Sequence, residues 1–194
     1  NLDADAMAVN QFLGGSLESF SNDILTGIVS GGFAYQRNLV SVDLPNVTVI
    51  ENVRCFYYCS KLENINLPNL VEIDTYNFIT GCNALRTVIF PKLKSINGTS
   101  ISHNDGLEKI DFHAIENIGS HNFNSCDILS TVILRSSTVC ILGVSCFQDT
   151  PIANGGGYIY VPSVLVENYK TATNWSAFAD QIRAIEDYPD ICGT

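Results

Sequence analysis

Apolar residues recur along this chain at intervals of 22 or 23 positions, and each recurrence begins with a leucine. The leucines are Leu17, Leu39, Leu62, Leu85, Leu107 and Leu129. Self-similarity at a fixed interval of this length is the signature of a solenoid, in which each repeat stacks on the next. We therefore predict about six repeats that together form a solenoid domain over residues 17–152.

Each repeat is predicted to contain one short β-strand. The residues three and five positions after each leucine are apolar in nearly every repeat, and the positions around them are mostly polar. This alternation is typical of a half-buried strand. Pro45, Pro68 and Pro91 follow the strand in three repeats. Because proline lacks a backbone N–H donor, the chain must turn away there.

The rest of each repeat is a return segment with further apolar columns, two aliphatic and one aromatic. The aromatic column is Phe33, Phe56, Phe78, Phe123 and Phe147, with Ile101 in the remaining repeat. A unit of this size cannot bury its own apolar face. The columns of neighbouring repeats must therefore join into one continuous core.

The two ends of the array are predicted to be caps, because an open solenoid end would expose the core. In residues 1–16 we expect a short helix that Asp3 caps and that carries Met7, Phe12 and Leu13. Residues 153–194 are the predicted C-terminal cap and tail.

The C-terminal cap is predicted to start with a strand over residues 158–161 that Pro162 ends. Ser163 suits the N-cap of a following helix. A second helical segment then places Trp175 over the core, and residues after Glu186 are expected to form a free tail.

Two repeats carry a recognisable motif. They are residues 39–61 (LVSVDLPNVTVIENVRCFYYCSK) and residues 62–84 (LENINLPNLVEIDTYNFITGCNA), and they resemble the BspA-like branch of the leucine-rich-repeat family. That family's pattern is roughly L-x-x-L-x-L-P-x-L-x-x-I-x-x-x-A-F-x-x-C. The resemblance covers residues 17–150, and residues 158–186 are similar to the cap that often follows such arrays.

The chain also departs from this pattern in places. One repeat has Ile101 in the phenylalanine position and Asn104 near the cysteine position, and His113 and Arg135 stand where proline is expected. The resemblance implies an α/β repeat fold, a right-handed leucine-rich-repeat solenoid with a short helical C-terminal cap. It also implies a non-enzymatic adhesion module, bacterial and secreted or on the cell surface, since the family is linked to host extracellular matrix proteins.

The charge balance limits the classes of partner. The chain has 10 Lys and Arg against 20 Asp and Glu, a formal net charge of -10. Such a protein repels phosphate backbones and anionic lipid, so nucleic acid is not an expected partner. No apolar run approaches the roughly 18 residues needed to cross a bilayer, so no membrane insertion is expected in this segment.

Seven cysteines raise the question of disulfide, metal or redox chemistry. Cys59, Cys82 and Cys126 share one repeat position and should form an inward column. Small buried thiols explain this column better than a metal site, although a Cys59–Cys82 disulfide is geometrically conceivable. Cys192 lies in the tail, where it is either free or paired with another molecule. We expect no metal and no cofactor.

No catalytic residues are predicted. His103, His113 and His121 occupy different repeat positions, so they should point to different faces. Asp43 and Asp111 share a position but lie about 15 Å apart at strand spacing, too far for a glycosidase pair. A hydrolase is therefore only the third of the functions considered.

The strand residues that point out of the core form the candidate binding face. The predicted contacts are Arg86, Ile89, Asp111, Ile133, Glu63 and Glu108. Solenoids commonly recognise partners through such a face. A protein or glycan surface is the expected partner, and an ordinary solvated sheet face is the alternative. A structural or host-recognition component of a phage virion is the second function considered.

Overall fold

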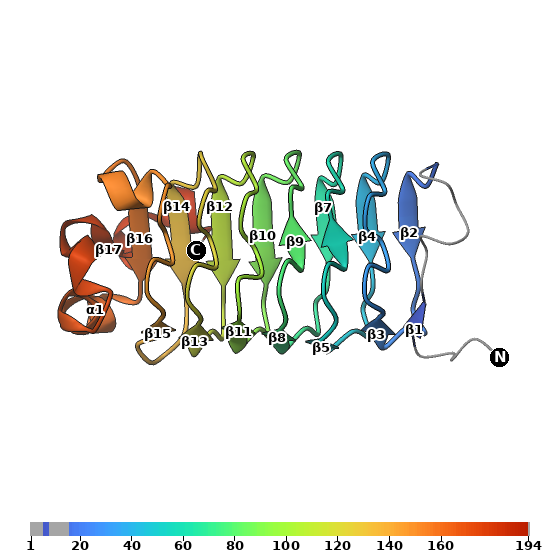
Figure 1. Cartoon of the computed structure of the whole chain (residues 1–194). Helices are drawn as coiled ribbons and strands as arrows, with labels where there is room; N and C mark the ends of the chain where they lie inside the picture. The colour runs from blue at the N-terminus through green and yellow to red at the C-terminus, as the bar shows by residue number, and fades with distance from the viewer. Residues whose placement is uncertain (1–5, 8–15, 194) are drawn as a thin grey trace.

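The chain is a solenoid whose turns stack along one axis (Figure 1). The structure, a computed structural model, describes residues 6–7 and 16–193. Every strand pair in it is parallel, and partners come from successive turns. This arrangement follows from the repeat, because equivalent segments of neighbouring turns lie side by side and run in the same direction.

One side of the solenoid, which we call the strand face, carries the predicted strands and one further strand, β17, which was expected to be helical. They are β2 (Ser19–Ser21), β4 (Ser41–Asp43), β7 (Asn64–Asn66), β10 (Thr87–Phe90), β12 (Lys109–Phe112), β14 (Thr131–Leu134), β16 (Tyr158–Val161) and β17 (Ile182–Ala184). They form two sheets, β2-β4-β7 and β10-β12-β14-β16-β17. The first seven of these strands follow one another along the axis in Figure 1.

The return segments contain short strands and turns rather than helices. One row is β1 (Ala6–Met7), β3 (Gly27–Ile28), β5 (Val49–Ile50), β8 (Glu72–Asp74), β11 (Ser95–Asn97), β13 (Asn117–Ile118) and β15 (Ile141–Leu142). Strands β5 to β15 of this row form one sheet, and β1 pairs with β3. A third row contains β6 (Phe56–Tyr57) and β9 (Ile79–Thr80), which pair with each other.

The predicted columns stack and form the core. Leu62, Leu85 and Leu107 are each fully buried, and the register places Val88 opposite Ile110 in the next turn. The aromatic column is continuous at its start, where the ring centroids of Phe33 and Phe56 lie 5.0 Å apart and those of Phe56 and Phe78 lie 5.6 Å apart. The predicted leucine-rich-repeat solenoid is confirmed.

The cysteine column links each turn to the one before it. Buried thiols of Cys59, Cys82 and Cys126 donate to a backbone carbonyl of the preceding turn, at Sγ···O distances of 2.9, 3.0 and 3.4 Å. Asn104 replaces cysteine in one repeat, and its Nδ2 donates to the equivalent carbonyl at 3.0 Å. The position therefore requires a small donor, and both residue types satisfy it.

All seven cysteines lie in the described part of the chain, and each is a free, buried thiol. Burial raises the pKa of Cys55, Cys126 and Cys146 to about 12 each. A thiol with so high a pKa is a poor nucleophile and a poor metal ligand at neutral pH. The interpretation of the column as buried thiols agrees with this environment.

The start of the chain differs from its prediction. Ala6 and Met7 form strand β1, which pairs with β3, instead of lying in a helix. The strand adds one more parallel partner to the stack. Asp3, Phe12 and Leu13, which were assigned to the same helix, lie outside the described residues.

The C-terminal cap follows its prediction in outline. Strand β16 ends before Pro162, a 3₁₀ helix spans Ser163–Leu165, and α1 spans Val166–Thr171. Ser163 does not act as a side-chain N-cap; its backbone N–H instead donates to Glu186 Oε2 at 3.0 Å. A second 3₁₀ helix covers Ser176–Gln181.

Two aromatic side chains of the cap close the end of the core. Trp175 is fully buried, and its indole N–H donates to the Cys140 carbonyl at 2.6 Å. The Tyr169 hydroxyl accepts from the Cys140 N–H at 2.9 Å. These bonds satisfy backbone groups that would otherwise be exposed at the last turn, as a cap must do. The predicted core-covering role of Trp175 is confirmed.

The expectation of a free tail after Glu186 is wrong. A 3₁₀ helix (Ile185–Asp187) leads into α2 (Pro189–Cys192), and α2 lies against the strand face beside β14 (Figure 1). Cys192 is only 2% exposed. We call residues 187–193 the C-terminal tail.

We expect the stability of the fold to fall steeply above pH 9. In the unfolded chain a thiol loses its proton near pH 9, whereas Cys55, Cys126 and Cys146 keep theirs to about pH 12 in the fold. The folded state binds more protons in that window, so each thiol costs about 1.4 kcal/mol per pH unit. Urea unfolding at pH 8 to 10.5 measures this slope. Cys126→Ala should reduce it by one thiol's share, and an unchanged slope would contradict the assignment.

Replacing Asn104 should be costly. Its Oδ1 accepts from the Cys82 N–H at 2.9 Å, and its Nδ2 donates to the Ile79 carbonyl. Asn104→Ala leaves both buried backbone groups without this partner, which costs roughly 2–4 kcal/mol of unfolding free energy. Asn104→Cys keeps the donor and should cost less. Denaturant unfolding measures both, and equal losses would argue against the donor role.

Candidate interaction surface

The strand face presents its outward side chains in rows that run along the solenoid axis. Of the six predicted contacts, Glu63, Arg86, Ile89 and Glu108 are exposed. Ile89 is 49% exposed, and it is the apolar member of these four residues, since the other three are charged. These four residues come from β10 and from the positions just before β7, β10 and β12, so three successive turns bring them together.

Charge on this part of the face is only partly neutralised. Arg86 Nη1 lies 3.5 Å from Glu108 Oε1, and the same nitrogen donates to the Gly106 carbonyl at 3.2 Å. Both contacts draw the guanidinium towards β12. Among the described residues, Glu63 has no ion-pair or hydrogen-bond partner for its side chain. An exposed ion pair contributes little, about 0–1 kcal/mol, so these groups are free to meet a partner.

A groove of about 820 Å³ lies between β7 and β10. Its lining is Glu63, Asn64, Ile65, Asn66, Pro68, Ala84, Arg86, Thr87, Ile89 and Pro91. Ile65 and Ile89 supply apolar surface, and the carboxylate, guanidinium and amides surround it. Ile65 is partly exposed here, although its column neighbour Val88 is fully buried.

The groove coincides with a break in the strand face. Strands β7 and β10 are neighbours in the stack but belong to different sheets. In other turns the equivalent N–H groups, such as those of Asn64 and Lys109, donate to the preceding turn at 3.1 Å. Thr87 holds the same repeat position, yet within residues 16–193 no backbone hydrogen bond joins β10 to β7. The β8–β11 pair remains intact, so only one side opens.

The remaining two predicted contacts are not exposed, and this part of the prediction is wrong. Ile133 is fully buried and Asp111 is 5% exposed. The C-terminal tail covers them: Ile133 packs with Tyr160, Ile185 and Cys192 in a small apolar cluster outside the main core. An outward strand position is therefore not sufficient for exposure.

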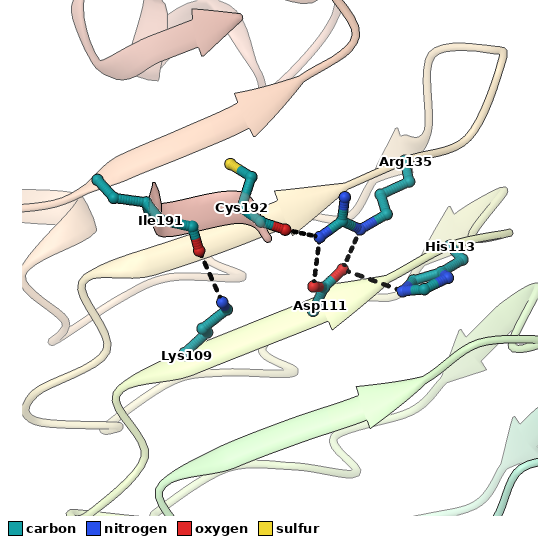
Figure 2. A network of polar contacts seen from close by, with 6 residues as sticks. All are labelled: Lys109, Asp111, His113, Arg135, Ile191 and Cys192. Carbon is teal, nitrogen blue, oxygen red and sulfur yellow. Dashed lines mark hydrogen bonds and ion pairs between the residues drawn. The ribbon is translucent and has the colours of Figure 1, made fainter. Parts of the chain in front are cut away.

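Asp111 is the centre of a polar network beside this cluster (Figure 2). Both of its oxygens accept from Arg135, whose Nε and Nη2 lie 2.8 Å from them. His113 Nε2 lies 3.5 Å from Asp111 Oδ1. The hydrogen bonds to Asp111 raise the pKa of the Arg135 guanidinium. A bidentate pair of this kind holds two charges that would be costly to bury singly.

Sequence reasoning missed Arg135 as a contributor to this face. The signal was its departure from the repeat, since both Arg135 and His113 occupy the position where three other repeats have proline. Without the proline ring, this position can hold a long polar side chain that reaches back to the preceding strand. Figure 2 shows both side chains converging on Asp111.

The charged side chains of the described residues do not gather into a metal site. No group of three or more His, Cys, Asp or Glu side chains is placed to hold a metal ion in that part of the chain. The Asp111 carboxylate is engaged by Arg135, so it is not available as a general base. The geometry is suited to binding.

Stacked turns with parallel strands and aligned leucine columns define the class of leucine-rich-repeat proteins, which are generally interaction modules. Within it, the family model described as "BspA type Leucine rich repeat region" matches residues 26–154 with 6 copies. The chain therefore belongs to the BspA-type leucine-rich-repeat family.

One solved structure supports the fold. The T. pallidum leucine-rich repeat protein is similar over 87% of this chain and 88% of its own, with 18% identity and a TM-score of 0.51. A leucine-rich repeat protein from Bacteroides ovatus is also found, over 86% of this chain and 65% of its own, with 16% identity and a TM-score of 0.33. None of the curated proteins compared with the sequence matches it. Among the described residues, no helix is long and apolar enough to span a bilayer.

The break in the strand face predicts a local loss of hydrogen-exchange protection. We expect the Thr87 amide to exchange at least about tenfold faster than those of Asn64 and Lys109, because it lacks their bond to the preceding turn. Exchange measured by NMR on the native protein tests this. Equal protection of the three amides would show that β7 and β10 are paired in solution.

Proposed function

We propose that this protein is a non-enzymatic adhesion module that binds a protein partner through the open part of its strand face. The binding surface is centred on the groove between β7 and β10. The observation that carries the proposal is the coincidence of the groove with exposed Ile89 and unpaired Glu63. A stable interface needs an apolar centre inside a polar rim, and this surface has both.

The groove favours a protein segment over a smooth surface. Its walls are two strands whose facing edges are not hydrogen-bonded to each other. Backbone groups on such edges are available to a ligand's own backbone or side chains. Glu63 lacks a counter-ion among the described residues, so a basic side chain of the partner would be favoured beside it.

Membership of the BspA-type family supports placement outside the cell. We propose a bacterial protein, secreted or attached to the cell surface, with a host or matrix protein as partner. A glycan is the alternative ligand, because the rim amides and carboxylate could bind sugar hydroxyls.

The experiment is a binding screen against extracellular matrix proteins and mucins, followed by two variants. Ile89→Asp places a charge in the groove and should weaken binding at least about tenfold, because burial of such a side chain is worth roughly 1.5–3 kcal/mol. Ile141→Asp is the matched control, since Ile141 is 69% exposed on β15, away from the strand face. Surface plasmon resonance measures both.

Two outcomes would reject the proposal. One is no binding to any of these proteins at high micromolar concentration. The other is equal loss for Ile89→Asp and Ile141→Asp, which would mean that the groove is not the contact.

A further inference from the structure

The C-terminal tail sits on the strand face in the way that a bound peptide would. Its helix α2 ends with Gly193 in the left-handed conformation, and its last carbonyls face two cations. Lys109 Nζ donates to the Ile191 carbonyl at 2.9 Å, and Arg135 Nη2 donates to the Cys192 carbonyl. Positive charge at a helix C-terminus is a favourable arrangement. Figure 2 shows both side chains reaching from β12 and the end of β14 to the tail.

The apolar part of the contact is small. Cys192 packs with Ile133 and Tyr160, and the Tyr188 ring lies edge-on to Tyr160 with centroids 5.3 Å apart. The rest of the tail is exposed. A hollow of about 380 Å³ extends beside it, between the tail and strands β14 and β16.

Release of the tail would leave no buried charge unpaired in the fold. Asp111 keeps its two bonds to Arg135, because both groups belong to the solenoid. Lys109 lies at the solvent edge, and the tail carbonyls would be hydrated. Ile133 and Tyr160 would become the apolar centre of a surface with Lys109, Asp111 and Arg135 around it. This is the anatomy of a protein-binding hot spot.

We infer that this patch (Lys109, Asp111, Ile133, Arg135 and Tyr160) is a second docking surface, which the C-terminal tail covers in the free protein. The partner that fits it is a protein carrying a short helical turn. The carbonyls at the end of that turn face Lys109 and Arg135, and a small apolar side chain packs on Ile133 and Tyr160. The inference rests on the proposed function only in that both use the strand face.

Displacement of the tail is the step that opens the patch. Because the tail is tethered to the solenoid, it competes with a partner at a high effective concentration. A partner must therefore make contacts beyond the patch in order to displace the tail. The hollow beside the tail and the open groove further along the same face supply surface for such contacts.

The first test follows the thiol of Cys192 as a reporter of tail release. In the native protein, Cys192 should react with a thiol reagent before Cys82 and Cys126, because those two thiols become accessible only when the solenoid unfolds. Lys109→Met removes one bond to the tail and should speed its labelling on the order of fivefold. Lys94→Met is the control, because Lys94 is an exposed lysine that pairs with Glu116 away from the tail. Mass spectrometry of peptide fragments locates the label.

The second test supplies the tail from outside. Tyr188→Ala together with Cys192→Ala weakens the tail in the full chain and leaves the patch intact. A fluorescent synthetic peptide of residues 186–193, with Cys192 kept reduced, should bind this variant saturably and bind the unaltered protein far more weakly. Adding Lys109→Met to the variant should reduce the binding. Fluorescence anisotropy measures all three.

Three results would overturn the inference. Labelling of Cys192 at the rate of Cys82 and Cys126 would make the tail an integral part of the fold. If the peptide shows no saturable binding up to millimolar concentration, the patch serves only to pack the C-terminal tail and is not a docking surface. Dimers of the tail-weakened chain that the peptide dissolves would identify a second copy as the occupant. None of these outcomes depends on Ile89 or on the groove.

Discussion

The structure depends on one constraint: a turn of this solenoid can satisfy its apolar and polar groups only against the turns beside it. The core columns meet this constraint with side-chain contact, and the strand rows meet it with backbone hydrogen bonds. The buried thiols and Asn104 meet it inside the turn, where each donates to a carbonyl of the preceding turn. Because every repeat must satisfy its buried groups against its neighbours in the same way, the same residue types recur.

This constraint explains which parts of the fold the sequence could reveal. The leucine spacing, the strand alternation and the aromatic column all result from contacts between adjacent turns. They therefore repeat in the sequence at the interval of 22 or 23 residues and can be predicted from it. The cysteine column was visible for the same reason. The structure adds why Asn104 is tolerated there, since an amide donates to the same carbonyl.

Contacts between residues several repeats apart could not be predicted from the sequence. The tail meets Lys109 and Arg135, which precede it by 82 and 57 positions, and no periodic pattern encodes such a distance. Asp111 and Ile133 were therefore predicted to be exposed from their strand position alone. The break between β7 and β10 was equally hidden, because Leu62 and Leu85 keep the regular interval. Regular spacing indicates that turns stack but does not show that every row of bonds between them is made.

The one-sided break gives the molecule a mechanical character of its own. Across that joint, the strand face contributes no backbone bonds, while the β8–β11 row and the Ile79-to-Ser100 contact remain. A load applied along the solenoid axis is thus shared by fewer bonds at this joint than at its neighbours. Within the strand face this joint is the compliant point, and tension along the axis would widen the groove before it separated the other strands of that face.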